Sequence, residues 1–359
     1  MLHRWLALPA APIAGRIGAG SVWTGDELVI FGGVTRAGRA DADAIVEASD
    51  GAAYRPATRT WRLLSPPPQG VLGVVGSASA WTGDIAVFWA GNSPDGPAVG
   101  ALYDPGTDSW QRLPAGPLGP REGYASVWTG QELLVIGGTS GDGIAEPTAA
   151  AIDPEKRTWR QLRGLDAFPG LLPRGAVWTG SEVIIPGSLS LCPDQGSSCT
   201  QFRPIVVAYE PTRDTVREIS LAKTPMTTEQ AEGLAAVGWT GTRVLMSVAE
   251  TKAPRLFTYE PATDKWVAAA SAPCEQLDAS YSATAWTGQL YIAACGRDSI
   301  QIYDAAGDEW KKLATGESPL TTRSGPVVAW TGDTLIAWSG TPRAKFNPTP
   351  ADGAELRLP

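Results

Sequence analysis

Residues 124–138 read YASVWTGQELLVIGG, and the arrangement of this stretch decides the fold. An apolar run precedes the tripeptide Trp128-Thr129-Gly130, a second apolar run follows it, and a pair of glycines ends the second run. Two strand-like runs around a glycine-containing tight turn predict a β-hairpin. The tripeptide occurs seven times, at a spacing of about 50 residues, so the hairpin is part of an internal repeat. The copies start at Trp23, Trp81, Trp128, Trp178, Trp239, Trp286 and Trp330.

Each hairpin is followed by a second recurring element that supplies two more strands. An aromatic residue, an acidic residue and a proline come together, as in Tyr103-Asp104-Pro105, and a tryptophan lies seven residues after the aromatic residue, as at Trp110. Val216 takes the tryptophan position in the fourth copy. Seven units of four strands predict an all-β, seven-bladed β-propeller, a fold that protects its strand edges. We expect one such domain over residues 1–359.

The order of a glycine pair, a tyrosine and a tryptophan resembles the kelch repeat, and the chain is similar to the galactose oxidase/kelch-like superfamily over essentially its whole length. The resemblance implies kelch-type blades. Some kelch proteins hold acidic ligands with arginines, and bacterial sialic-acid mutarotases of this repeat type act on a carboxylated sugar. The copper site of galactose oxidase needs histidines, and His3 is the only one here, so copper chemistry is not expected.

The last repeat copy is incomplete, which bears on how the ring closes. It has Phe346 at the aromatic position but Gly353 where the tryptophan is expected. Near the other end of the chain, Trp5 begins the stretch WLALP, which is similar to the stretch WQRLP that begins at Trp110. We therefore predict that the N-terminal strand completes the last blade. The alternative is that residues 355–358 supply its outer strand.

The composition narrows the classes of partner. The net charge of −8 and the pI near 4.9 argue against nucleic acid, which binds through its phosphates, and against an anionic membrane surface. There is no run of about 18 apolar residues, so no membrane-spanning helix is expected. Residues 1–17 contain prolines and arginines and no continuous apolar region, so no signal peptide is visible.

The predicted strand order assigns the connections to two faces of the ring. The Trp-Thr-Gly turns and the turns after the proline element lie on one face, which we call the turn face. The connections after the glycine pair and those between blades lie on the opposite face, which we call the loop face. The connections of the loop face vary in length, and variable loops on a rigid scaffold are where binding sites usually lie.

Four arginines near the starts of the innermost strands are the candidate ligand-binding residues. Arg16, Arg121 and Arg323 each lie seven residues before their tryptophan, and Arg174 lies four before its own. We expect them to cluster at the mouth of the central channel, where they could hold a carboxylate or phosphate through paired hydrogen bonds. The alternative is that each arginine binds a backbone carbonyl or an acidic residue of the adjacent blade.

Three acidic residues at neighbouring or equivalent positions, Glu122, Glu232 and Asp278, are the candidate general bases. The single histidine excludes serine–histidine and cysteine–histidine catalysis, and neither a metal site nor a cofactor is expected. The leading interpretation is a binding module whose loop face and arginine-rich mouth hold a protein segment, a glycan or a small anionic ligand. The alternative is a cofactor-free isomerase, epimerase or lyase acting on a carboxylated sugar or another small anion.

The four cysteines form two local pairs. Cys192 and Cys199 flank a turn-rich hexapeptide, whereas Cys274 precedes the first strand of the sixth blade and Cys295 ends its second strand. This placement predicts the disulfides Cys192–Cys199 and Cys274–Cys295 on the loop face. Two such bonds favour an oxidising, extracytoplasmic compartment, either secreted or periplasmic. Four free or buried thiols are the alternative.

Overall fold

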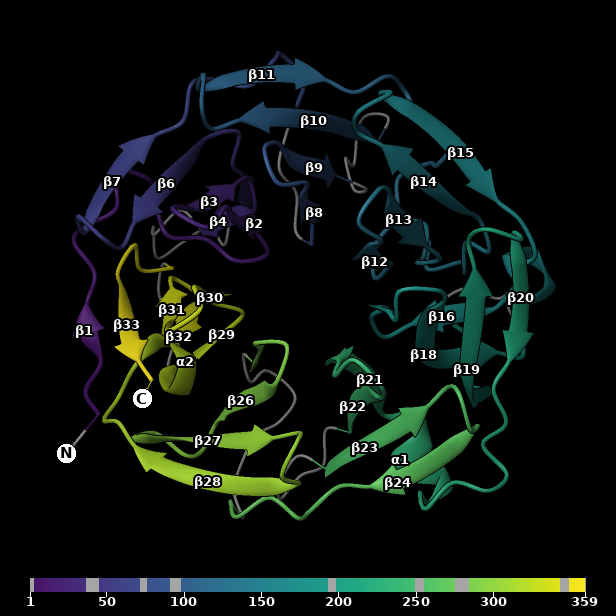
Figure 1. The fold of residues 1–359 in the computed structure, drawn as a ribbon. Coiled ribbons are helices and arrows are strands. Elements are labelled where there is room, and N and C mark those ends of the chain that lie inside the picture. Colours follow the sequence, from purple (N-terminus) through teal and green to yellow (C-terminus); the bar gives the residue numbers. More distant parts are fainter. Residues whose placement is uncertain are drawn as a thin grey trace.

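The computed structural model describes residues 3–36, 45–71, 76–90, 98–192, 198–248, 255–274, 284–342 and 349–358. It confirms the seven-bladed propeller: seven antiparallel sheets surround a central axis, and their outermost strands run along the circumference (Figure 1). Each sheet is one blade, and the Trp-Thr-Gly copies begin at the ends of the innermost strands.

The first three blades follow the predicted order of strands. The first contains β2 (Gly20–Trp23), β3 (Leu28–Phe31), β6 (Gly51–Arg55) and β7 (Thr60–Leu63). The second contains β8 (Ala78–Trp81), β9 (Ala86–Ala90), β10 (Val99–Asp104) and β11 (Ser109–Arg112). The third contains β12 (Ala125–Trp128), β13 (Leu133–Ile136), β14 (Ala149–Asp153) and β15 (Thr158–Leu162).

In the fourth blade the innermost strand is divided into two pieces. They are β16 (Leu171–Pro173) and β17 (Val177–Trp178), and both pair with β18 (Val183–Ser190), which is followed by β19 (Phe202–Glu210) and β20 (Thr215–Glu218). The fifth blade contains β21 (Leu234–Trp239), β22 (Val244–Val248), β23 (Arg255–Glu260) and β24 (Lys265–Ala268). The sixth contains β25 (Thr284–Trp286), β26 (Leu290–Ala294), β27 (Ser299–Asp304) and β28 (Glu309–Ala314).

The seventh blade joins the two ends of the chain and closes the ring. It contains β30 (Val327–Trp330), β31 (Thr334–Trp338), β33 (Gly353–Arg357) and, as its outermost strand, β1 (Leu6–Ala7). The predicted closure by the N-terminal strand is therefore confirmed, and the alternative in which residues 355–358 are outermost is wrong. Leu356, rather than Phe346, holds the aromatic position, because it pairs with Leu335 as Tyr54 pairs with Leu28. Phe346 lies outside the described residues.

Short elements connect the blades on the loop face. Two small hairpin pairings are β4 (Val34–Arg36) with β5 (Ile45–Glu47) and β29 (Arg323–Ser324) with β32 (Thr341–Pro342). The described helices are one turn or little more: η1 (Leu165–Ala167), α1 (Thr228–Glu232) and α2 (Pro319–Thr322).

The Trp-Thr-Gly tripeptide recurs because its threonine and glycine build the same turn in every blade. In the third blade, the Thr129 N–H donates to the Glu132 carbonyl, and the Glu132 N–H donates back to the Thr129 hydroxyl at 3.0 Å. The glycine of each copy adopts a φ between +91° and +116°, which favours glycine because it has no Cβ. The tryptophan of each copy is half-buried against the preceding blade.

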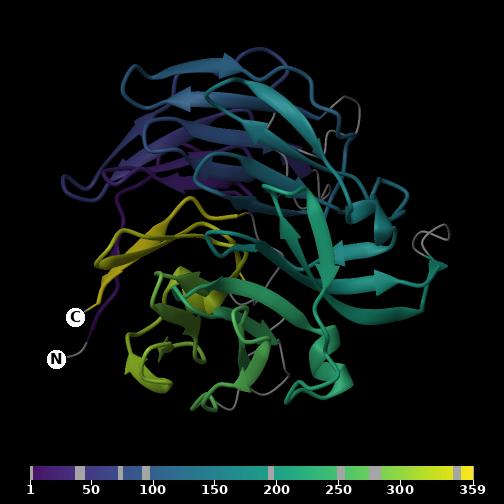
Figure 2. The ribbon, with the colours of Figure 1, turned by 45° about the vertical axis from the view of Figure 1, so that its right-hand side comes forward.

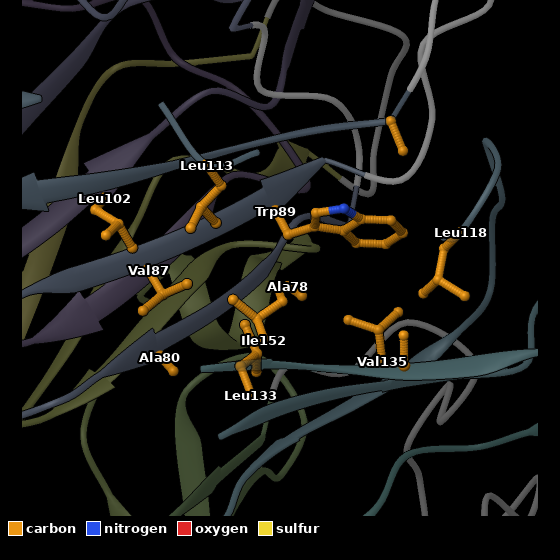
Figure 3. Packing of buried hydrophobic residues seen from close by; sticks show 12 residues of the cluster. Ala78, Ala80, Val87, Trp89, Leu102, Leu113, Leu118, Leu133, Val135 and Ile152 are labelled. Atoms are coloured by element: carbon orange, nitrogen blue, oxygen red, sulfur yellow. The ribbon is translucent and has the colours of Figure 1, made fainter. Parts of the chain in front are cut away.

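The hydrophobic core is divided among the blade interfaces. Seven clusters of buried residues are present, one between each pair of neighbouring blades. Figure 3 shows the cluster between the second and third blades, where Trp89 lies among Leu113, Leu118 and Val135. Trp89 is 1% exposed, and Trp338, at the equivalent position of the last blade, is 0% exposed. Both tryptophans therefore serve blade packing and offer no surface for stacking a ligand.

At the rim, the end of each outer strand meets a turn of the next blade. Between the first two blades, the Asp108 carboxylate accepts from the Tyr103 hydroxyl at 2.6 Å and from the Ser65 N–H at 3.1 Å. The Trp110 indole donates to the Ser65 carbonyl at 2.7 Å. Three other indoles make the same contact: Trp61 donates to the Pro9 carbonyl, Trp159 to that of Pro114 and Trp310 to that of Ala270. In each case the acceptor lies four residues after the tryptophan position of the preceding blade.

Candidate functional site

The candidate arginines in the first and third blades are buried and bound to their own blades. Arg16 is 0% exposed; its Nη1 donates to the carbonyls of Gly32 and Asp50, both at 3.1 Å, and forms an ion pair with the Asp50 carboxylate at 2.8 Å. Arg121 is 2% exposed, and its Nη1 donates to the carbonyl of Gly137 at 3.1 Å. These guanidinium groups face backbone rather than an open channel.

The arginine contacts have a common cause in the glycine pair. The paired residues take positive φ values and leave the strand ladder, so the carbonyl of the first one needs another donor. The arginine sixteen residues earlier supplies it in three blades: Arg16 to Gly32, Arg121 to Gly137, and Arg323 to Ser339. Each arginine also bonds a carbonyl just before the third strand.

Of the four arginines, Arg16 and Arg323 share one contact residue, Ser339, and Arg174 is exposed. The backbone N–H of Arg16 donates to the Ser339 hydroxyl at 2.6 Å, while Arg323 Nη1 donates to the Ser339 carbonyl at 3.2 Å, so both arginines meet at Ser339. Arg323 is half-buried and pairs with Asp352 at 2.7 Å. Arg174 lies in the break between β16 and β17, and its side chain is exposed.

The electrostatics of Arg121 suit a structural role. Burial lowers the pKa of Arg121, and the carboxylate of Glu146, 4.0 Å away, works against that effect. Its Nη2 also donates to the Thr148 hydroxyl at 3.0 Å. A guanidinium group with these partners has little donor capacity left for a ligand.

The candidate general bases lie on separate blades. Glu122 is exposed just before the innermost strand of the third blade, and Glu232 is exposed at the end of α1, before the fifth blade. The fourth blade stands between them. Asp278 lies outside the described residues, as do Asp41 and Asp43 of the loop in the first blade.

Both predicted cysteine pairs are present. Cys192 and Cys199 are joined with their Cα atoms 5.6 Å apart, and Cys274 and Cys295 with theirs 5.9 Å apart. The first disulfide lies at the end of the β18–β19 hairpin, which extends away from the body of the ring on the loop face (Figure 2). Beside it, Leu191 is 54% exposed and Phe202 is 43% exposed.

A groove that the sequence did not reveal lies on the turn face between the fourth and fifth blades. Its volume is about 560 Å³. The fourth blade contributes Glu182 and Arg217, and the fifth contributes Trp239, Thr242 and Glu260. It combines one aromatic side chain with charged and hydroxyl groups, so it offers both an apolar surface and hydrogen-bonding groups to a ligand.

In the described part of the chain, no three His, Cys, Asp or Glu side chains come together as a metal site would require. None of the helices in this part has the length and apolar character needed to cross a membrane. A comparison with protein-family models finds no match, and a comparison with characterised proteins finds no significantly similar sequence.

Proposed function

We propose that the chain is a kelch-type propeller that binds a protein segment through its loop face, with the β18–β19 hairpin as the main contact. The supporting observation is that Leu191 and Phe202 are both exposed near the tip of a hairpin that a disulfide closes. Large apolar side chains on a rigid projection are a common feature of protein-binding surfaces. The proposed kelch type rests on the recurring order of small-residue pair, tyrosine and tryptophan.

The rigidity of the hairpin supports this assignment. Eight consecutive residue pairs join β18 to β19, and the Leu191 N–H donates to the Gln201 carbonyl at 2.9 Å beyond the last of them. Arg203 and Glu218 form an ion pair across the same blade at 2.6 Å. A preorganised surface loses less conformational entropy when a partner binds, so more of the contact energy appears as affinity.

The burial of two of the four candidate arginines counts against an isomerase, epimerase or lyase that would act on an anion in the channel mouth. An anionic ligand in the channel mouth would depend on Arg174 and the partly exposed Arg323, because Arg16 and Arg121 are buried.

We also propose an extracytoplasmic location, either secreted or periplasmic. The two disulfides support it, because such bonds persist in oxidising compartments and are rare in the cytosol. An extracellular partner protein fits the same setting.

Selection of binding peptides from a random displayed library on the immobilised propeller would test the proposed face. Peptides enriched on the wild type should lose at least about tenfold in affinity for the variant Leu191→Ser/Phe202→Ser, because the apolar contact is removed. Leu63→Ser is the matched control: it removes a leucine of similar exposure, 56%, from the outer strand β7, and should leave binding unchanged. Enriched peptides that bind the double variant as tightly as the wild type would contradict the proposal.

A further inference from the structure

The groove between the fourth and fifth blades contains an arginine that is less engaged than its counterparts. Arg62, Arg160 and Arg217 occupy equivalent places on the outer strands of the first, third and fourth blades, and each pairs with the glutamate four residues after the tryptophan of its own turn. Arg62 and Arg160 use both Nε and Nη2 on that carboxylate. Arg217 reaches Glu182 through Nη2 alone, at 2.9 and 3.1 Å.

The side chain of Arg217 is also the most exposed of the three arginines. The side chains of Arg62 and Arg160 are 33% and 35% exposed, whereas that of Arg217 is 49% exposed. Burial works to lower the pKa of Arg217, but the Tyr259 hydroxyl and the charge of Glu182 raise it overall, so the group stays cationic. Arg217 therefore presents a charged, partly unengaged donor edge to the groove.

The same interface lacks the two contacts that draw other blades together at the rim. Elsewhere, Asp108, Asp214 and Asp308 each bind a backbone N–H of the preceding blade. Asp264, the counterpart in the fifth blade, accepts from the Tyr259 hydroxyl at 2.9 Å but from no backbone N–H among the described residues. The indole nitrogen of Trp266 is buried without a hydrogen-bond partner. The groove thus lies at an interface that lacks both of these rim contacts.

The mixed charges of the groove favour a ligand that can both donate and accept hydrogen bonds. Glu182 offsets Arg217, and Glu260 adds one further carboxylate on the opposite wall, so an acidic ligand meets repulsion. Glu260 would attract a cationic ligand, but an ammonium group has no acceptor to offer the guanidinium group of Arg217. A neutral ligand with several hydroxyl groups avoids both, since its hydroxyls can donate to the carboxylates and accept from the guanidinium.

From this we infer that the groove between the fourth and fifth blades is a binding site for a neutral saccharide of one or two rings. Trp239 would contact the apolar C–H face of one ring, while Arg217 and Glu260 would bind its hydroxyls from either side. The volume of about 560 Å³ suits a ligand of this size. The site lies on the turn face and is independent of the proposed protein contact on the loop face.

Saturation-transfer NMR with a panel of neutral hexoses, N-acetylhexosamines and their disaccharides tests the site. We expect transfer to at least one neutral sugar and none to glucuronic acid or to a lysine-containing tripeptide. Absence of transfer to every neutral sugar at about 5 mM, the weak end of the affinity scale, would overturn the inference. Transfer to the acidic or the cationic probe in place of the neutral ones would overturn it as well.

Substitutions matched between blades locate the binding. Thr242→Trp fills the groove from an exposed turn position and should abolish transfer, whereas Gln131→Trp, at the equivalent position of the third blade's turn, should not. Arg217→Ala should weaken binding at least tenfold, and Arg160→Ala less than twofold. Unchanged transfer in Thr242→Trp would refute the site. Leu191→Ser/Phe202→Ser should leave sugar binding intact, so this result and that for the loop face can be read separately.

Discussion

In six blades, the residue five positions after the aromatic position of the repeat, which Ile152 occupies in the third blade, has an unusual backbone conformation. These six residues take a φ between +49° and +54° although none is glycine: Arg59, Asp108, Arg157, Asp214, Asp264 and Asp308. Aspartate tolerates this conformation better than most residues. Arg59 and Arg157 reach the preceding blade instead, through Glu355 and Gln111 respectively. The position therefore supplies contacts between blades as well as a turn.

Arg121 provides a test of the buried arginine contacts at the residue scale. Arg121→Ala removes a hydrogen-bond donor from three carbonyls, those of Gly119, Gly137 and Thr148, and should lower the free energy of unfolding by about 2–4 kcal/mol. Chemical denaturation of the variant measures this loss. Arg174→Ala is the control, because that side chain is exposed, and it should change stability by less than about 0.5 kcal/mol. Equal stability of the two variants would show that Arg121 is not needed for the fold.

The sequence predicted which arginines recur but left open what they bind. Spacing placed Arg16, Arg121 and Arg323 at one position of the repeat, and an ionic ligand and a backbone partner were both compatible with it. The deciding fact is the positive φ at both residues of the pair that ends the second strand, which frees a carbonyl. The close approach of the incoming chain also requires glycine at the second position, since a Cβ on Gly138 would lie 2.6 Å from the Glu122 carbonyl oxygen.

Among the elements, β1 is the shortest of the seven outermost strands, yet the segment around it contacts two blades. Leu6 and Ala7 pair with β33, and the Leu8 N–H donates to the Gly353 carbonyl at 2.9 Å. The first blade binds the same segment, since the Trp61 indole donates to the Pro9 carbonyl at 3.0 Å. The N-terminal segment is therefore held from two sides.

Removing residues 1–9 tests the importance of this strand. The deletion exposes the edge of β33 and takes away the acceptor of Trp61, so we expect the melting temperature to fall by about 10 °C, which corresponds to several kcal/mol. Scanning calorimetry provides the measurement. Leu6→Ser keeps the strand but changes a side chain that is 55% exposed, and it should shift the transition by no more than about 2 °C. A truncated protein that melts with the wild type would show that β1 is dispensable.

The positions of the strands could be predicted from the sequence where the repeat is regular. They could not be predicted where a copy departs from the pattern. The stretch WLALP identified β1 because it matches the outer strand of another blade. The third strand of the last blade was misplaced, since Phe346 offered an aromatic residue before a proline, whereas Leu356 has no such sequence signal. The pairing register between β31 and β33 decides which residue takes the aromatic position. That register depends on contacts between residues far apart in the sequence, which a local pattern does not reveal.

For the whole molecule, carboxylates at the rim make stability depend on pH. Burial alone would raise the pKa of Glu27, but the guanidinium groups of Arg62 and Arg55 lower it overall. Burial would likewise raise the pKa of Asp108, and hydrogen bonds from Tyr103 and Ser65 lower it. A carboxyl whose pKa is lower in the folded state stabilises the fold above its unfolded pKa and loses that effect as pH falls through the folded value.

We therefore expect the free energy of unfolding to be nearly constant from neutral pH down to about 5 and to decline below about pH 4. Urea titrations at a series of pH values give the profile. Asp108→Asn/Asp214→Asn accepts the left-handed backbone but carries no charge, so it should be less stable than the wild type at neutral pH and lose less on acidification. Parallel acid profiles for both proteins would exclude a role for these two carboxyls.

The number of blades and the way the ring closes could be predicted from the sequence, because both depend on the repeat. The groove between the fourth and fifth blades could not. It lies at an interface where Trp266 and Asp264 are present as the repeat predicts, yet do not make the contacts with the preceding blade that their counterparts make. Such differences arise from how whole blades sit against one another, which local patterns do not specify.

The pairing of β1 with β33 has a consequence for biosynthesis. As the polypeptide leaves the ribosome, β1 emerges before the other strands of the propeller, while β33, on which it depends, emerges after them. Six blades can form in order during translation, but the seventh has to wait until β33 has been made. Until then, both flanks of the growing arc stay uncovered, and this interval is when the nascent protein most needs protection from aggregation.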